Sequence, residues 1–190
     1  IAGNTRMELN KTKITGCYEI VPNVFRDARG TFVKPYNQDV YEKLGLDFSI
    51  KEQYYSFSYK NVIRGLHFQI PPLDHVKVVY CLSGTVIDVV VDLRVGSPTY
   101  GKYEMFELSE SRGNAIYIPK GLAHGFCVMS NDAILVYNVS SVYSPNHDSG
   151  IRWDSVGIPW PVKNPIMSDR DRNLCAFEKF SSPFFYEAEG

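Results

Sequence analysis

The chain has 190 residues, of which 44% are hydrophobic and 22% charged, and its formal net charge is −1. This length and composition predict one globular domain that buries its own hydrophobic core without disulfides or a structural metal. The near-neutral charge and scattered basic residues argue against a nucleic-acid-binding protein, and no apolar run approaches the roughly 18 residues of a membrane span.

The four cysteines, Cys17, Cys81, Cys127 and Cys175, show no CxxC spacing. This predicts reduced thiols and a cytoplasmic protein. The amino terminus lacks the charged and then apolar pattern of a signal peptide. Residues 1–6, ahead of Met7, are either native or an artificial extension, and the sequence leaves both readings open.

Most of the chain is predicted to form short strands, because β-branched and aromatic residues gather between Gly, Pro, Asn and Asp. The predicted strands cover residues 18–20, 31–35, 50–58, 76–82, 85–93, 102–108, 115–118, 125–128 and 133–143. A helix is expected over residues 37–45, with Asn37 as N-cap and Gly45 just past its end. A second short helix or turn starts at Ser168. Many short strands and few helices predict an all-β sandwich, jelly roll or barrel.

Alternation within the predicted strands suggests a barrel with an apolar wall and a polar pocket. Ile87, Val89 and Val91 form one apolar face, and Asp88 and Asp92 lie on the other. The alternative is a polar face that is simply exposed to water.

A cupin-like spacing follows in the second half of the chain. The segment from Gly113 to His124 fits the second cupin signature, G(x)5PxG(x)2H. In metal cupins that histidine joins an HxH pair and a glutamate, but here the earlier motif reads His67-Phe68-Gln69, without the second histidine. Two histidines are too few for a metal site, which needs three or four ligands. We therefore expect no metal.

Four longer motifs resemble one family. Residues 62–69 read VIRGLHFQ, residues 89–101 carry VVVDLR and SPTYG, residues 118–126 contain IPKG and AHGF, and residues 150–154 read GIRWD. They are similar to the dTDP-4-dehydrorhamnose 3,5-epimerase family, from about Gly16 to Asp171. The resemblance implies an all-β cupin jelly roll, or double-stranded β-helix barrel, with a few short helices. It implies one domain over residues 1–190, with residues 165–190 as an extension packed on the barrel.

The resemblance also implies an activity. Family members need no cofactor and invert C3, C5 or both carbons of a nucleotide-diphospho-4-keto-6-deoxy sugar, through proton abstraction, an enolate and reprotonation. They form homodimers with exchanged amino-terminal strands. Two other classes stay open, a metal-dependent cupin enzyme and a non-catalytic cupin that binds nucleotide sugars.

By the motif match, His67 is the catalytic base and Asp171 orients it. Asp171 ends the sequence Ser168-x-x-Asp171, which also fits a helix N-cap by Ser168. If the local register differs, Asp169 replaces Asp171 as the partner of His67.

The resemblance assigns two further catalytic residues, Tyr137 as the acid and Lys77 beside the ketone oxygen. Tyr143 is expected on the same strand face as Tyr137, as a wall for the substrate. Asp88 is expected to pair with Lys77 in the pocket.

The remaining predicted residues bind substrate. Arg29 and Arg64 match positions that hold the diphosphate, since arginine suits phosphate recognition. The chain departs from the thymidine-specific pattern where the base is read, so dTDP, CDP and GDP sugars, hexose or heptose, all stay open. The positions of these departures are Lys34, Glu52, Gln53, Tyr54, Asp148 and Arg170. Gln69, Asp88, His124 and Tyr143 complete the predicted substrate-binding set.

Overall fold

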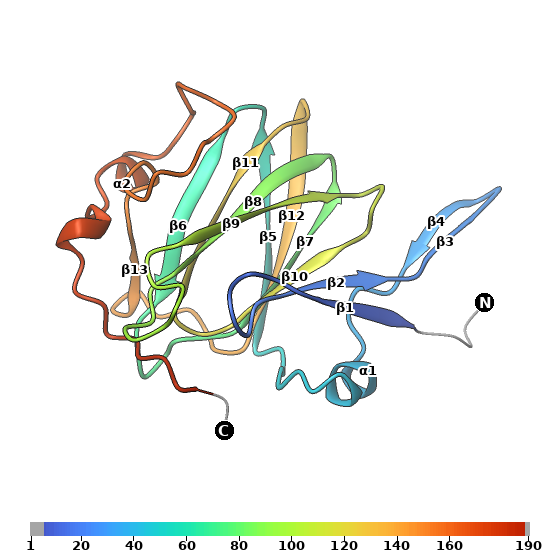
Figure 1. The fold of residues 1–190 in the computed structure, drawn as a ribbon. Helices are drawn as coiled ribbons and strands as arrows, with labels where there is room; N and C mark the ends of the chain where they lie inside the picture. Colours follow the sequence, from blue (N-terminus) through green and yellow to red (C-terminus); the bar gives the residue numbers. More distant parts are fainter. Residues whose placement is uncertain (1–5, 189–190) are drawn as a thin grey trace.

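Two antiparallel sheets face each other and form the body of the molecule (Figure 1). The computed structural model describes residues 6–188. The six-stranded sheet has the order β1 (Met7–Lys11), β2 (Tyr18–Pro22), β10 (Ala115–Ile118), β7 (Lys77–Ser83), β12 (Asp132–Val139) and β5 (Glu52–Tyr59). The five-stranded sheet has the order β13 (Asp148–Gly150), β6 (Ile63–Gln69), β11 (Leu122–Val128), β8 (Thr85–Asp92) and β9 (Tyr103–Ser109). This is the jelly-roll architecture that the sequence predicts.

The main core lies between the two sheets. Val79 and Leu135 of the six-stranded sheet pack with Val90 and Phe126 of the five-stranded sheet, and all four are essentially inaccessible to water. Each such side chain contributes about 1.5 to 3 kcal/mol through its burial. The sheets are therefore held firmly wherever apolar residues fill the space between them.

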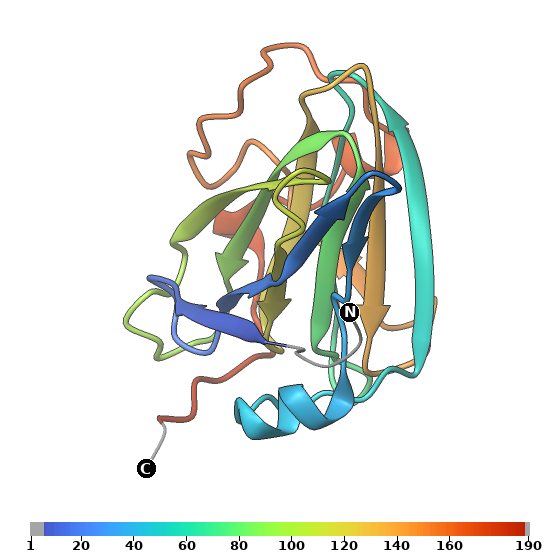
Figure 2. The ribbon, with the colours of Figure 1, turned by 90° about the vertical axis from the view of Figure 1, so that its right-hand side faces the viewer.

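The outer face of each sheet is covered by a different segment. The helix α1 (Gln38–Lys43) and the residues after it bring Tyr41 and Phe48 against Val78 of the six-stranded sheet. Figure 2 shows this helix beside one end of the sheet. The carboxy-terminal residues bring Phe184 onto Phe68 of the five-stranded sheet, with ring centroids 5.6 Å apart.

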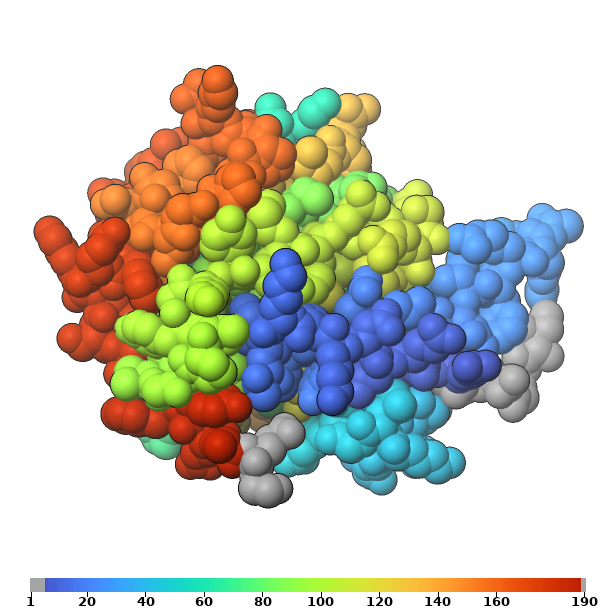
Figure 3. Space-filling view, in the orientation of Figure 1, coloured from blue at the N-terminus to red at the C-terminus, as the bar shows by residue number. Residues whose placement is uncertain are grey.

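A hairpin and two short helices also lie outside the two sheets. The strands β3 (Val24–Asp27) and β4 (Gly30–Val33) form a hairpin that stands out from the body of the molecule (Figures 1 and 3). The helix α2 (Asp169–Arg172) lies next to β6, and the 3-10 helix η1 (Phe177–Lys179) follows it. In the described part of the chain, no helix is long and apolar enough to cross a membrane.

The structure confirms most of the predicted elements and corrects several boundaries. The predicted helix is α1, and the Asn37 side chain accepts a hydrogen bond from the Val40 N–H at 3.1 Å. The strand predicted over residues 133–143 ends at Val139, because Ser140 and Ser141 turn their hydroxyls to the backbone of Val76 and Leu73. Four strands were not predicted: β1, β3, β6 and β13. The question about residues 1–6 falls almost wholly on residues 1–5, outside the described range.

Candidate active site

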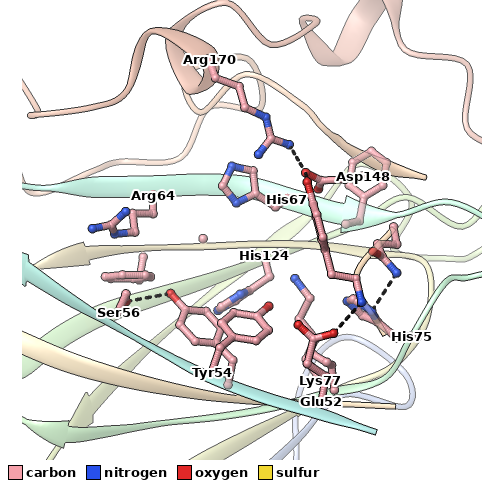
Figure 4. Close-up of a pocket in the computed structure, with 17 residues that line it drawn as sticks. Glu52, Tyr54, Ser56, Arg64, His67, His75, Lys77, His124, Asp148 and Arg170 are labelled. Carbon is pink, nitrogen blue, oxygen red and sulfur yellow. Dashed lines mark hydrogen bonds and ion pairs between the residues drawn. The ribbon is translucent and has the colours of Figure 1, made fainter. Parts of the chain in front are cut away.

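A cavity of about 390 Å³ opens between the two sheets, and polar side chains from both of them line it (Figure 4). The six-stranded sheet contributes Glu52, Tyr54, Ser56, Lys77, Tyr137 and Val139. The five-stranded sheet contributes Arg64, His67, Phe68, Gln69, His124, Gly125, Phe126 and Asp148. His75, Tyr143 and Arg170 complete the wall.

A histidine and a buried carboxylate form a pair at the edge of this cavity. His67 Nε2 lies 2.7 Å from Asp171 Oδ1, and the other Asp171 oxygen accepts the Gly65 N–H at 3.0 Å. Burial by itself would raise the pKa of Asp171, but the hydrogen bond and charge of His67 and the Gly65 N–H lower that pKa below its usual range. Asp171 is therefore a carboxylate that holds the imidazole ring in one orientation.

The short helix α2 presents Asp171, and it begins with a capping hydrogen bond. Ser168 Oγ accepts the Asp171 N–H at 3.1 Å while the Asp171 side chain reaches His67. Both readings of the Ser168-x-x-Asp171 motif are thus present in one turn of chain. Asp169 is exposed and is not the partner of His67.

Two glycines bring β6 and β11 unusually close. A Cβ added to Gly125 would lie 2.6 Å from the Arg64 carbonyl oxygen, and one added to Gly65 would lie 2.7 Å from Gly125 Cα. Here β6 carries one extra residue, since Arg64 pairs with Phe126 and His67 pairs with His124. This β-bulge turns His67 toward the cavity, directly beside His124.

His124 forms a second, deeper pair with a carboxylate. Its Nε2 lies 2.7 Å from Asp88 Oδ2, and both residues are buried. Burial raises the pKa of Asp88 and lowers the pKa of His124. Asp88 pairs with His124 instead of forming the expected ion pair with Lys77, although its charge still acts on the Lys77 amine.

Lys77 reaches the cavity from β7 as a nearly buried amine, with 6% of its surface exposed. Within residues 6–188 its side-chain amine forms no hydrogen bond or ion pair. Burial lowers the pKa of Lys77 to about 8, against the opposing charges of Asp148 and Asp88. The amine is therefore suited to meet an oxygen that gains negative charge inside the cavity.

Tyr137 lines the cavity from β12 and is held by two residues of β5. Its hydroxyl lies 3.1 Å from Ser56 Oγ, and its ring stacks on that of Tyr54 with centroids 4.7 Å apart. Burial raises the pKa of the Tyr137 hydroxyl, which therefore stays protonated at neutral pH. A neutral phenol in this position can give up a proton to a strong base.

Charged and aromatic residues gather at another part of the wall. Arg170 forms an ion pair with Asp148 at 2.7 Å, and the Tyr143 hydroxyl lies 3.4 Å from the same Asp148 oxygen. Glu52 accepts the Tyr143 N–H at 2.6 Å through one carboxylate oxygen. Arg64 donates its Nε–H to Ser58 at 2.9 Å. Two guanidinium groups thus border the cavity, as an anionic substrate requires.

The sequence matches the family model described as dTDP-4-dehydrorhamnose 3,5-epimerase over residues 11–179. It is 42% identical to the dTDP-4-dehydrorhamnose 3,5-epimerase of Shigella flexneri over 170 residues, covering 88% of this chain and 94% of that one. The chain belongs to the dTDP-4-dehydrorhamnose 3,5-epimerase family. It is an enzyme, a nucleotide-sugar epimerase, as the motifs predict.

Two further members of the epimerase family are relevant here. A dTDP-4-dehydrorhamnose 3-epimerase of Streptomyces niveus is 39% identical, covering 88% of this chain and 82% of that one. The crystal structure of the dTDP-6-deoxy-D-glucose-3,5-epimerase of Legionella pneumophila in complex with dTDP-4-keto-L-rhamnose superposes with a TM-score of 0.91. It is 33% identical and covers 96% of this chain and 100% of that one.

Five residues predicted for the site of this epimerase do not line the cavity. Asp171 and Asp88 meet it only through His67 and His124, to which they are hydrogen-bonded, and the other three lie apart from it. Gln53 alternates with its neighbours on β5, faces away and donates to Asn138 at 2.6 Å. Arg29 lies on the β3–β4 hairpin, exposed and paired with Asp27 at 2.6 Å. Lys34 follows the same hairpin and does not line the cavity. Gln69 lines the cavity, but its amide supports the loops at Leu73 and Ser144, at 2.7 Å in each case.

Several cavity residues were not predicted. Ser56 could have been found, because it follows Glu52 and Tyr54 at the two-residue spacing of one strand face. His75 lies two residues before Lys77, so the same two-residue spacing could have pointed to it. Phe68, Gly125 and Phe126 lie within the quoted family motifs but have no acidic, basic or hydrogen-bonding side chain to mark them, and nothing pointed to Val139. Among residues 6–188, no group of three or more His, Cys, Asp and Glu side chains could hold a metal ion.

Proposed function

We propose that this epimerase inverts C3, C5 or both carbons of a nucleotide-diphospho-4-keto-6-deoxy sugar, with His67 as base and Tyr137 as acid. One observation carries the proposal. His67 extends from β6 and Tyr137 from β12, so the two groups enter one cavity from opposite sheets. Inversion at carbon requires a base on one face of the sugar and an acid on the other.

The first step forms an enolate. His67 takes the proton from the carbon next to the ketone, and the electron pair of the C–H bond moves to the ketone oxygen. Asp171 steadies the imidazolium that forms, as a carboxylate does beside a catalytic histidine. Lys77, with no other ion-pair partner among the described residues, meets the enolate oxygen.

The second step returns a proton from the other side. Tyr137 gives its phenolic proton to the enolate carbon, the carbon–oxygen double bond reforms, and the configuration is inverted. Solvent then takes the proton from His67 and restores the one on Tyr137. His124, held by Asp88 next to His67, contributes to the polar floor on which the sugar lies.

We propose that Arg64 and Arg170 bind the diphosphate and that Tyr143 packs on the substrate. The Legionella relative holds dTDP-4-keto-L-rhamnose, which supports a nucleotide sugar as ligand. The base stays open among dTDP, CDP and GDP. The Glu52 oxygen not bonded to Tyr143 can accept a hydrogen bond from the N3–H of thymine as well as from an amino group of cytosine or guanine, so it does not choose among the three bases.

We propose a homodimer with exchanged amino-terminal strands. The β3–β4 hairpin, which carries Arg29, stands out from the body of the molecule (Figure 3), and Phe32 on β4 is 51% exposed. In a dimer, Arg29 and Lys34 would reach the cavity of the second copy. This arrangement accounts for two predicted binding residues that do not line the cavity of their own chain.

We further propose one domain over residues 1–190 in the cytoplasm. Phe180 and Phe184 pack on Phe68, which supports the assignment of residues 165–190 as an extension of the barrel. The free thiols of the four cysteines suit a reducing compartment.

A substrate panel tests the function. The protein is incubated with dTDP-, CDP- and GDP-linked 4-keto-6-deoxy sugars, and NMR follows the configuration at C3 and C5. We expect inversion with at least one of them and its loss in His67→Ala. Binding without inversion in all three would favour the non-catalytic class. Inversion that depends on stoichiometric bound iron or zinc would favour the metal-dependent class.

A further inference from the structure

Two residues of the neighbouring strand β5 contact the Tyr137 side chain, one at its ring and one at its hydroxyl. Tyr54 is the direct cross-strand partner of Tyr137, and their rings are nearly parallel, with an interplanar angle of 18° and centroids 4.7 Å apart. Ser56, two residues further along the same face of β5, contacts the Tyr137 hydroxyl at 3.1 Å. One residue therefore sets the plane of the ring, and the other sets the position of its oxygen.

Tyr54 also separates Tyr137 from solvent. Tyr54 is 40% exposed, whereas Tyr137 is 8% exposed. The remaining ring contacts of Tyr137 are looser, with His124 at 6.1 Å and Phe126 at 6.5 Å between centroids. Stacked aromatic rings stabilise a fixed mutual orientation, and this stack is the closest contact that the Tyr137 ring makes with another aromatic side chain in the described residues.

We propose that Tyr54 and Ser56 are positioning residues that direct the Tyr137 proton to the face of the sugar opposite His67. This inference rests on the proposed function, since it takes Tyr137 as the acid. It predicts that inversion, and not proton abstraction, depends on the two β5 residues.

Ser56 has a second part in the proposal, because its hydroxyl can turn. A serine hydroxyl donates one proton and also accepts. While Tyr137 is protonated, Ser56 can accept its hydrogen bond. Once the Tyr137 proton has moved to the enolate carbon, the Ser56 O–H can donate to the phenolate oxygen left behind. No other polar side chain among residues 6–188 hydrogen-bonds this oxygen.

Loss of either residue is expected to change the side from which the enolate carbon is protonated. A misplaced Tyr137 leaves the proton abstraction by His67 intact, so the enolate still forms. The proton on His67, exchanged with solvent, then returns to the same face. The carbon gains solvent deuterium without inversion, and the ratio of exchange to inversion rises. A shift of about 1 Å in a reacting group costs on the order of 10²-fold.

The experiment measures this ratio in deuterated water by NMR, for the wild-type protein, Tyr54→Ala and Ser56→Ala. We expect each variant to raise the ratio about 10- to 100-fold. Tyr54→Phe keeps the ring and is expected to keep the wild-type ratio. Tyr55→Ala is the matched control, because Tyr55 lies on the opposite face of β5, opposite Val136 and 72% exposed. Near-ultraviolet circular dichroism checks that each variant is folded.

Tyr137→Phe and the double variant Tyr54→Ala/Tyr137→Phe separate the inference from the function on which it rests. If Tyr137→Phe leaves the ratio unchanged, Tyr137 is not the acid and the proposed function is overturned in that part. If Tyr137→Phe raises the ratio and Tyr54→Ala does not, the positioning role of Tyr54 is overturned alone. The positioning role is also overturned if Tyr54→Ala raises the ratio in the Tyr137→Phe background as much as in the wild type. A residue that acts through Tyr137 has no effect on the ratio once Tyr137 has lost its hydroxyl.

Discussion

At the scale of single residues, the cavity combines groups whose proton affinities differ because their surroundings differ. Asp171 is stabilised as a carboxylate by His67 and the Gly65 N–H, while Tyr137 is kept neutral by burial. Lys77 lies between these cases, because burial lowers its pKa to about 8. A base, an acid and a cation can then coexist within one small volume.

The pH dependence of the rate follows from Lys77. Below its pKa of about 8 the amine is positive and can stabilise the enolate oxygen, and above that pH it is neutral. We expect kcat/KM to fall as the pH rises through about 8. The fall in kcat should occur at a higher pH than the fall in kcat/KM, because the bound anionic substrate raises the pKa of the amine.

Lys77→Met tests this assignment, since it keeps the length of the side chain without its charge. We expect the rate to fall by about 10²- to 10³-fold and the alkaline limb to disappear. A pH–rate profile of Lys77→Met with the same alkaline limb would show that another group titrates there.

Asp171→Asn tests the histidine pair. The amide occupies the same space but cannot stabilise the imidazolium, so turnover should fall by about 10²- to 10⁴-fold. Asp169→Asn is the matched control in the same short helix, and its turnover should match the wild type because Asp169 is exposed. Equal losses in both variants would reject the specific role of Asp171.

Residue types in the site were largely predictable, whereas their exact partners were not. His67, Lys77 and Tyr137 lie together as the motif match implies. Gln53 was misplaced because one step along a strand reverses the direction of a side chain. Asp88 was assigned to Lys77 because the sequence does not tell which sheet a strand joins.

At the scale of elements, the approach of β6 and β11 places the two histidines side by side. The backbones come so close at Gly65 and Gly125 that neither position has room for a side chain. The β-bulge in β6 lies at this close contact of the two strands. The extra residue breaks the alternation of apolar positions, since Ile63 and Leu66 both point to buried sites. This explains why the strand that carries His67 was not predicted, although its motif was.

Gly125→Ala tests this packing. The new Cβ would lie 2.6 Å from the Arg64 carbonyl oxygen, which is backbone and cannot rotate away. We expect a loss of about 1 to 3 kcal/mol in the free energy of unfolding, measured by urea denaturation, together with lower activity. An unchanged unfolding midpoint would mean that the strands separate easily at this point.

At the scale of the whole molecule, the position of the β3–β4 hairpin bears on whether the site is built by one chain or shared by two chains. Its position away from the body explains why Arg29 does not line its own cavity. The motif match names Arg29 as a substrate-binding candidate, but a motif does not say which copy of the chain its side chain serves.

Complementation tests the shared site. Arg29→Ala and His67→Ala are each expected to lose most activity, the first through weaker diphosphate binding. Co-expression of the two variants with different tags gives mixed dimers, each with one intact cavity. With random pairing half of the dimers are mixed, so about a quarter of all sites are intact. No recovery in purified mixed dimers would show that Arg29 does not serve the partner's cavity.

The most direct test of the whole account is the incorporation of solvent deuterium at C3 and C5 during turnover, read separately by NMR. We expect deuterium at one or both carbons with the wild-type protein, and none at either carbon with His67→Ala. Inversion of configuration without deuterium, or unchanged incorporation by His67→Ala, would contradict it.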